Sequence, residues 1–278
     1  MNDLSQPIER YAELATGVRR IVAPNPSMMT GPGTNTYLLG VDEIAVLDPG
    51  PRLREHIKDI CDKAGAPIRW ILATHTHPDH SPGVRLLAEK TGAEVLGMPV
   101  PDGDLQDSSF QPTRLLANGD KLETAEFTIE TVHTPGHASN HLCYRDVARN
   151  WLFTGDHVID GSTVVINPPD GNMKHYLRSL EHVKALQPRA LLPGHGNRID
   201  DPNRVIDWII EHRLEREAKV LNALTANPNL TTRELVPTVY QDVPEKLHSW
   251  AERSLLAHLI KLEDDGAAIS DDHRWSAR

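Results

Sequence analysis

The residues best suited to chemistry lie in one short run, THTHPDH, at positions 74–80. In an extended loop His75 and His77 point to the same side, so both imidazoles can reach one metal ion. After the turn that the proline makes, Asp79 and His80 can face a second ion beside the first. Imidazole and carboxylate are the ligands that zinc accepts when no thiolate is present. The spacing therefore predicts two neighbouring metal ions.

Three further candidate ligands, His137, Asp156 and His195, each follow or end an apolar run. Glycines next to them allow the backbone to crowd a site. Loops at strand ends are held by a rigid sheet, and α/β proteins place reactive residues there. A carboxylate can also bridge two ions. We therefore expect these residues to join the 74–80 run in one centre.

Taken in order, these residues resemble the signature of the metallo-β-lactamase superfamily, and the resemblance covers essentially residues 20–200. It implies that Asp48, in the run LDPG, supports the histidine loop through hydrogen bonds without touching metal. It also implies a ligand set: one ion would be held by His75, His77 and His137, the other by Asp79, His80 and His195, and Asp156 would bridge them.

Short β-rich runs alternate with amphipathic helical patterns up to about residue 200, which predicts an α/β fold. The resemblance makes this fold a four-layer αββα sandwich. One helix is expected to have Ser81 as its cap, Pro82 as its first residue and Gly92 at its end. Every candidate ligand would then lie just beyond a strand. Strands are expected at 37–39, 44–47, 68–73, 127–132, 151–153 and 190–192.

A polar, proline-containing segment predicts a boundary between a catalytic domain at 1–202 and a C-terminal domain at 203–278. The second domain is expected to be helical, with a capping box of Thr231 and Glu234, and to end in a hairpin at 268–275. This order suggests a winged-helix module. It is similar to the domain appended to the β-lactamase-like protein 2 subfamily, which includes single-strand endoribonucleases and fungal thioesterases that release polyketides.

The last helix of this module carries Leu255, Leu259 and Leu262 at the spacing of a core stripe. Acidic residues around it would repel a phosphate backbone. We therefore expect the module to pack within the chain or to form a homodimer, and not to read DNA.

The formal net charge is −10 over 278 residues, which disfavours polyanionic partners. The two cysteines exclude a disulfide framework and a cysteine-rich zinc module. No apolar stretch reaches the roughly 18 residues that a membrane helix needs, so no membrane partner is expected. The N-terminal residues lack the apolar core of a secretory signal, and this predicts a cytoplasmic protein.

We expect two divalent ions, most readily zinc, although iron and manganese suit the same donors. Such a pair would lower the pKa of a shared water from about 15.7 to near 7, giving a metal-bridging hydroxide as the nucleophile. Asp79 is the expected catalytic residue, handling the proton as the hydroxide is consumed. Residues expected at the substrate rim are Asn35, in the turn around Thr34, and Asp170, Asn172 and Tyr176, in the segment 167–176.

The leading interpretation is a metal-dependent hydrolase of an ester-like bond, thioester or lactone included, in a small molecule. Phosphodiester hydrolysis of single-stranded RNA stays open, because the subfamily includes both activities. A third reading is a metal-loaded regulator whose winged helix binds nucleic acid. An open metal site argues against it, since a sensor needs no free position for water. Penicillin turnover is not expected, because β-lactamases of this fold usually place cysteine or serine near the position of Asp156.

The histidines outside this ligand set include His133, His141, His157 and His258. A histidine without metal-ligand spacing is usually a core or surface residue. We expect that role for these four, with some of them donating hydrogen bonds to the ligands.

Overall fold

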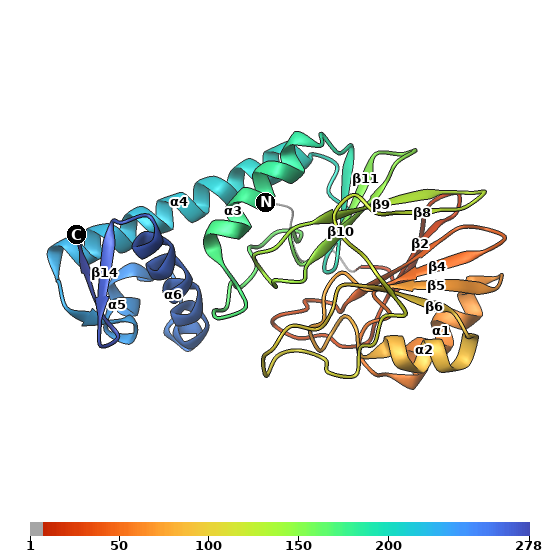
Figure 1. Cartoon of the computed structure of the whole chain (residues 1–278), viewed down its shortest axis with the longest axis horizontal. Helices are drawn as coiled ribbons and strands as arrows, with labels where there is room; N and C mark the ends of the chain where they lie inside the picture. Colours follow the sequence, from red (N-terminus) through yellow and green to blue (C-terminus); the bar gives the residue numbers. More distant parts are fainter. Residues whose placement is uncertain (1–7) are drawn as a thin grey trace.

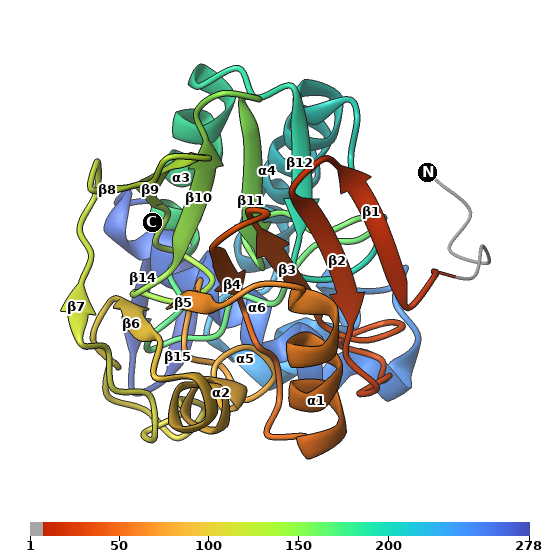
Figure 2. The same ribbon diagram turned by 90° about the vertical axis from the view of Figure 1, so that its right-hand side faces the viewer.

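The computed structural model describes residues 8–278. They form a layered body, residues 8–201, and a C-terminal unit, residues 227–278, joined by the long helix α4 (Pro202–Ala226) (Figure 1). In the layered body two sheets lie face to face, with α1 and α2 on one outer side and α3 and α4 on the other (Figure 2). This is the four-layer αββα arrangement that the sequence predicts.

The first sheet has seven strands in the order in which they occur along the chain. Its first four strands pair antiparallel, and the later neighbours pair parallel. Parallel neighbours need crossover connections, and α1 (Arg54–Ala64) and α2 (Gly83–Thr91) provide two of them. The strands are β1 (Tyr11–Ala15), β2 (Val18–Val22), β3 (Asn35–Leu39), β4 (Ile44–Leu47), β5 (Ile68–Leu72), β6 (Glu94–Gly97) and β7 (Arg114–Leu115).

The second sheet has five strands in the order β12-β11-β10-β9-β8. The strands β11 and β12 pair parallel, and α3 (Met173–Ala185) lies between them in the chain. The other pairs are antiparallel. The strands are β8 (Lys121–Glu123), β9 (Thr128–His133), β10 (Leu142–Asp146), β11 (Trp151–Gly155) and β12 (Ala190–Pro193).

Three apolar clusters hold these layers together. The cluster between the sheets includes Tyr37, Leu72 and Phe153, and the rings of Tyr37 and Phe153 meet edge to face with centroids 5.0 Å apart. A second cluster joins the first sheet to α1 and α2, and a third joins the second sheet to α3 and the start of α4. Because both faces of the sheets are covered, strands β3, β4 and β12 are buried along their whole length.

The C-terminal unit contains two helices and a three-stranded sheet. Thr231 and Glu234 form both halves of the predicted capping box at the start of α5, and Leu255, Leu259 and Leu262 are buried in this unit's core. The predicted hairpin is present as β14 and β15. The elements are β13 (Leu230–Thr231), α5 (Thr232–Val239), the 3₁₀ turn η1 (Glu245–Leu247), α6 (His248–Asp264), β14 (Ala268–Asp271) and β15 (Arg274–Ala277).

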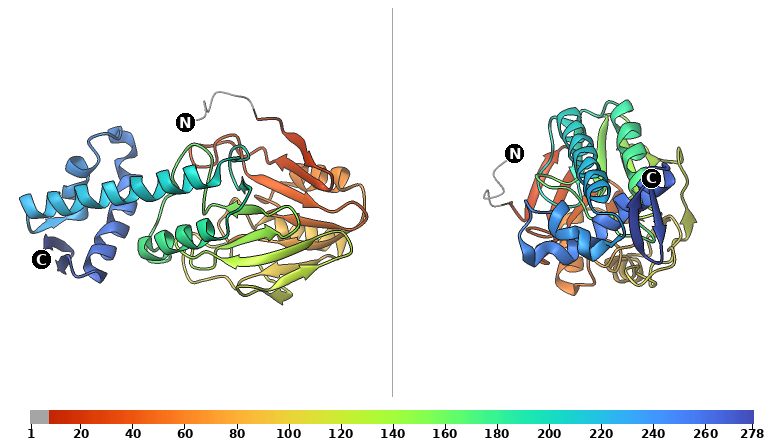
Figure 3. Two further views of the ribbon diagram at one scale, coloured as in Figure 1. Left: turned by 90° about the horizontal axis from the view of Figure 1, so that it is seen from above. Right: turned by 90° about the vertical axis from the view of Figure 1, so that its left-hand side faces the viewer.

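Helix α4 takes part in both cores (Figure 3). Ile206 and Ile209 pack against the second sheet, whereas Val220 and Leu224 belong to the core of the C-terminal unit. The division of the chain at residue 202 remains a prediction.

The start of α2 differs from the prediction. The helix begins at Gly83, and the Ser81 hydroxyl does not cap it but donates to Asp107 at 2.7 Å. The Gly83 N–H instead donates to the Gly50 carbonyl at 2.8 Å. A Cβ at Gly83 would lie 2.7 Å from the Pro49 carbonyl oxygen, so a glycine is required where the helix end meets this turn. Within residues 8–278 no helix is long and apolar enough to cross a membrane.

Replacing Phe153 with alanine should lower the free energy of unfolding by about 3–5 kcal/mol, because the fully buried ring fills the space between the sheets. Chemical denaturation measures this loss. The matched control is Leu115→Ala, since that side chain is 62% exposed and its removal should change stability by less than about 0.5 kcal/mol. Equal losses in the two variants would contradict the assignment of the inter-sheet core.

Candidate metal centre

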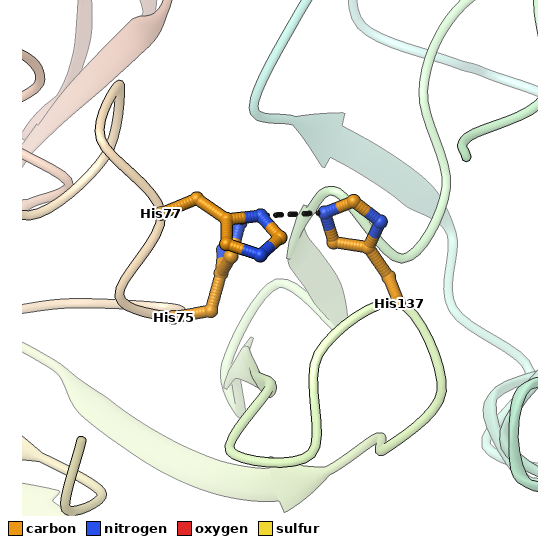
Figure 4. A group of neighbouring side chains, drawn as sticks. All are labelled: His75, His77 and His137. Carbon is orange, nitrogen blue, oxygen red and sulfur yellow. Dashed lines mark hydrogen bonds between the residues drawn. The ribbon is translucent and has the colours of Figure 1, made fainter. Parts of the chain in front are cut away.

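The predicted ligands lie on loops that follow strands β5, β9, β11 and β12. His75 and His77 come from the loop after β5 and meet His137 from the loop after β9 (Figure 4). The His77 Nδ1 atom lies 3.1 Å from His75 Nε2 and 3.0 Å from His137 Nε2. Three ring nitrogens therefore converge on one small volume, as ligands of a single ion would.

A second group of donors lies beside the first. His195 Nε2 is 3.2 Å from an Asp79 carboxylate oxygen, and His80 Nε2 is 3.6 Å from the same atom. Asp156 lies between the two groups. Its Oδ1 is 3.3 Å from both His80 and His195, and its Oδ2 is 3.6 Å from His137 Nε2. All seven predicted ligands are thus brought together.

The orientation of the rings suits metal binding. A neutral imidazole that donates through one nitrogen keeps the lone pair of the other for a cation. In four of the histidines Nδ1 lies against a fixed acceptor and Nε2 faces the centre. The acceptors are the Thr74 hydroxyl for His75 at 3.0 Å, Asp48 for His80 at 3.0 Å, the Val165 carbonyl for His137 at 2.8 Å and the Gly33 carbonyl for His195 at 3.2 Å.

Two buried ligand atoms also lack partners. His80 Nε2 and Asp156 Oδ1 have no hydrogen bond within residues 8–278, although they lie only 3.3 Å apart. Buried polar atoms in proteins nearly always have a partner. A cation shared by these two atoms would satisfy both, so the residues present fit a metal centre.

The pKa values divide the centre into two halves. Burial and the neighbouring His80 and His77 rings hold the pKa of His75 well below its usual range, and burial with His137 lowers the pKa of His77 to about 3. Burial alone would lower the pKa of His195 too, but the Asp156 and Asp79 carboxylates raise it to about 10. His75 and His77 are therefore neutral imidazoles, and the carboxylates beside His195 attract positive charge.

Asp48 anchors the histidine loop. Its carboxylate accepts from the Thr74 N–H at 2.7 Å and the Thr74 hydroxyl at 2.8 Å, besides His80. Because the Thr74 hydroxyl in turn accepts from His75, this one carboxylate orients a ligand in each half of the centre. Asp48 has a positive φ of 48°, a conformation that aspartate and asparagine tolerate better than other residues with a Cβ.

Two residues expected at the substrate rim lie inside the protein instead. Asn35 is fully buried, and its amide donates to the Pro193 and Gly196 carbonyls at 2.9 Å each, so it holds the loop of His195. Tyr176 is also fully buried, and its hydroxyl donates to the His157 carbonyl at 2.9 Å. Neither side chain is open to a substrate.

The other two rim residues occupy different positions. Asn172 caps α3 with its side chain, and its N–H donates to the Gly136 carbonyl at 2.8 Å, next to His137. Asp170 is half-buried and accepts from the Ser139 N–H at 3.2 Å and from the Gln106 amide at 3.1 Å. Of the four, Asp170 is the one that links two loops beside the centre and stays a candidate for the rim.

His141, one of the four histidines expected in the core or behind the ligands, supports the centre. His141 is buried, and its Nε2 accepts the Asp156 N–H at 3.2 Å, so it positions the central carboxylate. Met28 and Met29 are 71% and 45% exposed on the loop that leads to Gly33, whose carbonyl accepts from His195. In the sequence, the available signal for this loop is a pair of apolar residues next to a turn rich in proline and glycine. His157 and His258 are buried as expected of core residues, and His133 is half-buried.

Two sheets in an αββα sandwich, with a cluster of histidines and aspartates on the loops beyond the strands, define the class of metal-dependent hydrolases with this fold. Residues 29–195 match the family described as the metallo-beta-lactamase superfamily, and residues 231–275 match the beta-lactamase associated winged helix domain. The chain belongs to the metallo-beta-lactamase superfamily.

Several known proteins are similar over most of the chain. A protein of Drosophila melanogaster named beta-lactamase-like protein 2 homolog is 34% identical and covers 93% of this chain and 92% of its own length. An Aspergillus fumigatus protein named atrochrysone carboxyl ACP thioesterase is 28% identical, over 83% of this chain and 76% of its own. A crystal structure of a beta-lactamase domain protein from Burkholderia ambifaria has a TM-score of 0.84 at 22% identity, covering 96% and 93% of the two chains, which shows a shared fold.

The Asp48→Asn variant tests the anchor of the histidine loop. Asparagine keeps the shape and tolerates the positive φ, but its NH₂ group would face a buried donor of the loop. We expect a loss of about 1–3 kcal/mol in the free energy of unfolding of the metal-free protein, measured in urea. Asp59→Asn is the control, because Asp59 pairs with Arg10 at an exposed site and should matter by less than about 1 kcal/mol. A stable Asp48→Asn protein would show that the network is not needed.

Proposed function

We propose that the chain is a dinuclear, most readily zinc-dependent hydrolase that cleaves a thioester or a related ester-like bond. The observation that carries the proposal is the pair of donor groups, His75, His77 and His137 beside Asp79, His80 and His195, with Asp156 between them. A carboxylate between two sets of imidazoles suits two adjacent cations, because a carboxylate can serve as a ligand to both. Iron and manganese suit the same donors.

When bound, such ions would lower the pKa of a bound water toward about 7 and would polarise the substrate carbonyl. The chain supplies the rest. Asp48, Asn35 and His141 hold the ligand loops by buried hydrogen bonds, so little reorganisation is needed as charge develops on the substrate.

Asp79 is the proposed proton carrier. Its side chain is 27% exposed, compared with 13% for Asp156, so it is the more open of the two carboxylates in the centre. It can accept the proton of the attacking water and pass it to the departing thiolate, which leaves as the thiol while the acyl group leaves as the acid.

Three observations support an acyl substrate. The net charge of −10 disfavours a polyanion. The exposed Met28 and Met29 lie on the loop bound to His195, and their flexible apolar side chains suit an acyl chain. A relative from Aspergillus fumigatus is named as a thioesterase. Single-stranded RNA is the competing substrate, and the test below separates the two.

The homodimer through the C-terminal unit and the cytoplasmic location remain predictions. A dimer would have to use residues other than Leu255, Leu259 and Leu262, which are buried within the unit.

Asp79→Ala should reduce kcat by at least about 100-fold, because general acid–base groups contribute roughly that factor or more. The rate is measured with saturating zinc, and bound zinc is determined in the same sample so that a lost ion is not mistaken for a lost proton carrier. Asp104→Ala is the matched control, since Asp104 is an exposed carboxylate outside the ligand set. A metal-replete Asp79→Ala protein with the wild-type rate would rule out this role.

A substrate panel tests the proposed bond. The zinc-loaded protein is assayed with an aliphatic acyl thioester, a lactone, a β-lactam and single-stranded RNA at about 50 and 200 mM salt. We expect thioester hydrolysis that changes less than about two-fold with salt, because the substrate needs no basic contacts. RNA cleavage that falls steeply with salt, without thioester turnover, would replace the proposed function with nuclease activity.

A further inference from the structure

Helix α4 carries two buried arginines one turn apart that face different parts of the protein. Arg213 is 4% exposed, and its guanidinium donates to the Val164 carbonyl of the layered body. Arg216 is 5% exposed, and it donates to the Val239 carbonyl at 2.6 Å and pairs with Asp242 at 2.7 Å in the C-terminal unit. A buried guanidinium needs such partners, so both contacts are strong constraints.

The residue after Val164 binds a candidate metal ligand. The Val165 carbonyl accepts the Nδ1–H of His137 at 2.8 Å, and this bond turns His137 Nε2 toward His77. Residues 163–167 lie in no helix or strand, so no ladder of backbone hydrogen bonds fixes them. Because a peptide unit is planar, a fixed Val164 carbonyl also fixes the N–H and Cα of Val165, from which the Val165 carbonyl extends.

Apolar side chains of the helices also pack against residues 163–167. Val164 and Ile166 are buried in the cluster that contains Ile206 and Ile209 of α4 and Ala257 of α6. The Arg213 guanidinium also lies 5.6 Å from the centre of the Tyr176 ring, and the Tyr176 backbone touches Gly136, next to His137. Arg213 thus adds a polar contact to the apolar ones that hold this loop.

We propose that Arg213 is a positioning residue of the metal centre. It holds residues 164–166 so that the Val165 carbonyl fixes the tautomer and ring direction of His137, and it thereby links the centre to the helix that carries the C-terminal unit. The inference rests on the proposed function in one respect, namely that His137 is a metal ligand. Hydrogen-bond partners behind a ligand are worth about 10–100-fold in metal affinity, and Arg213 acts one peptide unit further out.

The test uses the full-length protein and cobalt(II) as the metal probe. We compare Arg213→Met, Arg213→Lys and Arg216→Met with wild type by the visible absorption spectrum of bound cobalt and by competition titration against a chelator. Arg213→Met should weaken the ion at the His75, His77 and His137 group about 10-fold and change its spectrum. Arg213→Lys keeps a donor and should lie between Arg213→Met and wild type.

Arg216→Met is the matched control, because it removes an equally buried arginine whose partners lie away from the centre. It should keep the wild-type spectrum and an affinity within about two-fold of wild type, even if it lowers stability. Circular dichroism and urea unfolding of the metal-free proteins identify variants that fail to fold. If Arg213→Met does not fold, the folded Arg213→Lys protein decides the question.

Wild-type cobalt affinity and spectrum in a folded Arg213 variant would overturn the inference and leave the proposed function intact. An equal loss in Arg216→Met would also overturn it, because the effect would then be a general loosening of α4. If the wild-type protein binds no cobalt at this group, the proposed metal centre itself fails and the inference fails with it.

Discussion

The charge on Asp156 is the constraint around which the rest of the centre is built. A carboxylate that is 13% exposed and touches three imidazoles is costly to remove from water unless positive charge compensates it. His80 and His195 face one oxygen of this carboxylate, and His137 faces the other. Positive charge is therefore needed beside both oxygens. The proposed pair of cations, with Asp156 between them, would supply this positive charge on both sides.

The loops that carry these ligands must be held rigidly, because charged side chains repel or attract one another strongly at short range. The loops obtain this firmness from side chains far away in the sequence. Asp48 lies 26 residues from Thr74, and Asn35 lies 158 residues from Pro193. Both bonds are buried, so they are little weakened by solvent. The sheets bring the strand ends together, and these hydrogen bonds then hold the ligand loops in place.

Features set by residues a few positions apart could be predicted from the sequence, whereas features set by contacts between distant segments could not. His75, His77, Asp79 and His80 were identifiable because their spacing is local and has a direct geometric meaning. The capping box of Thr231 and Glu234 is equally local. Asn35 and Tyr176 lie in segments expected around the centre, which predicts a place at the rim, but their hydrogen-bond partners come from other segments and hold them inside. The local pattern of Ser81 and Pro82 predicts a helix cap, and it fails because the helix start is set by a tertiary contact, the close approach of Gly83 to Pro49.

The contacts of the C-terminal unit suit it better to support the layered body than to bind nucleic acid. On α6, Leu255, Leu259 and Leu262 fill the unit's own core, and Ala257 packs against the layered body. Lys174 of α3 pairs with Asp265 at 2.6 Å just after α6, which adds a polar contact across the same interface. With these two faces occupied and acidic residues nearby, α6 is poorly suited to enter a groove lined by phosphates. Helix α6 packs against α3 and α4, and its Ala257 lies in the same cluster as Val164 and Ile166. The conformation of residues 164–166 in turn sets the direction of the His137 ring.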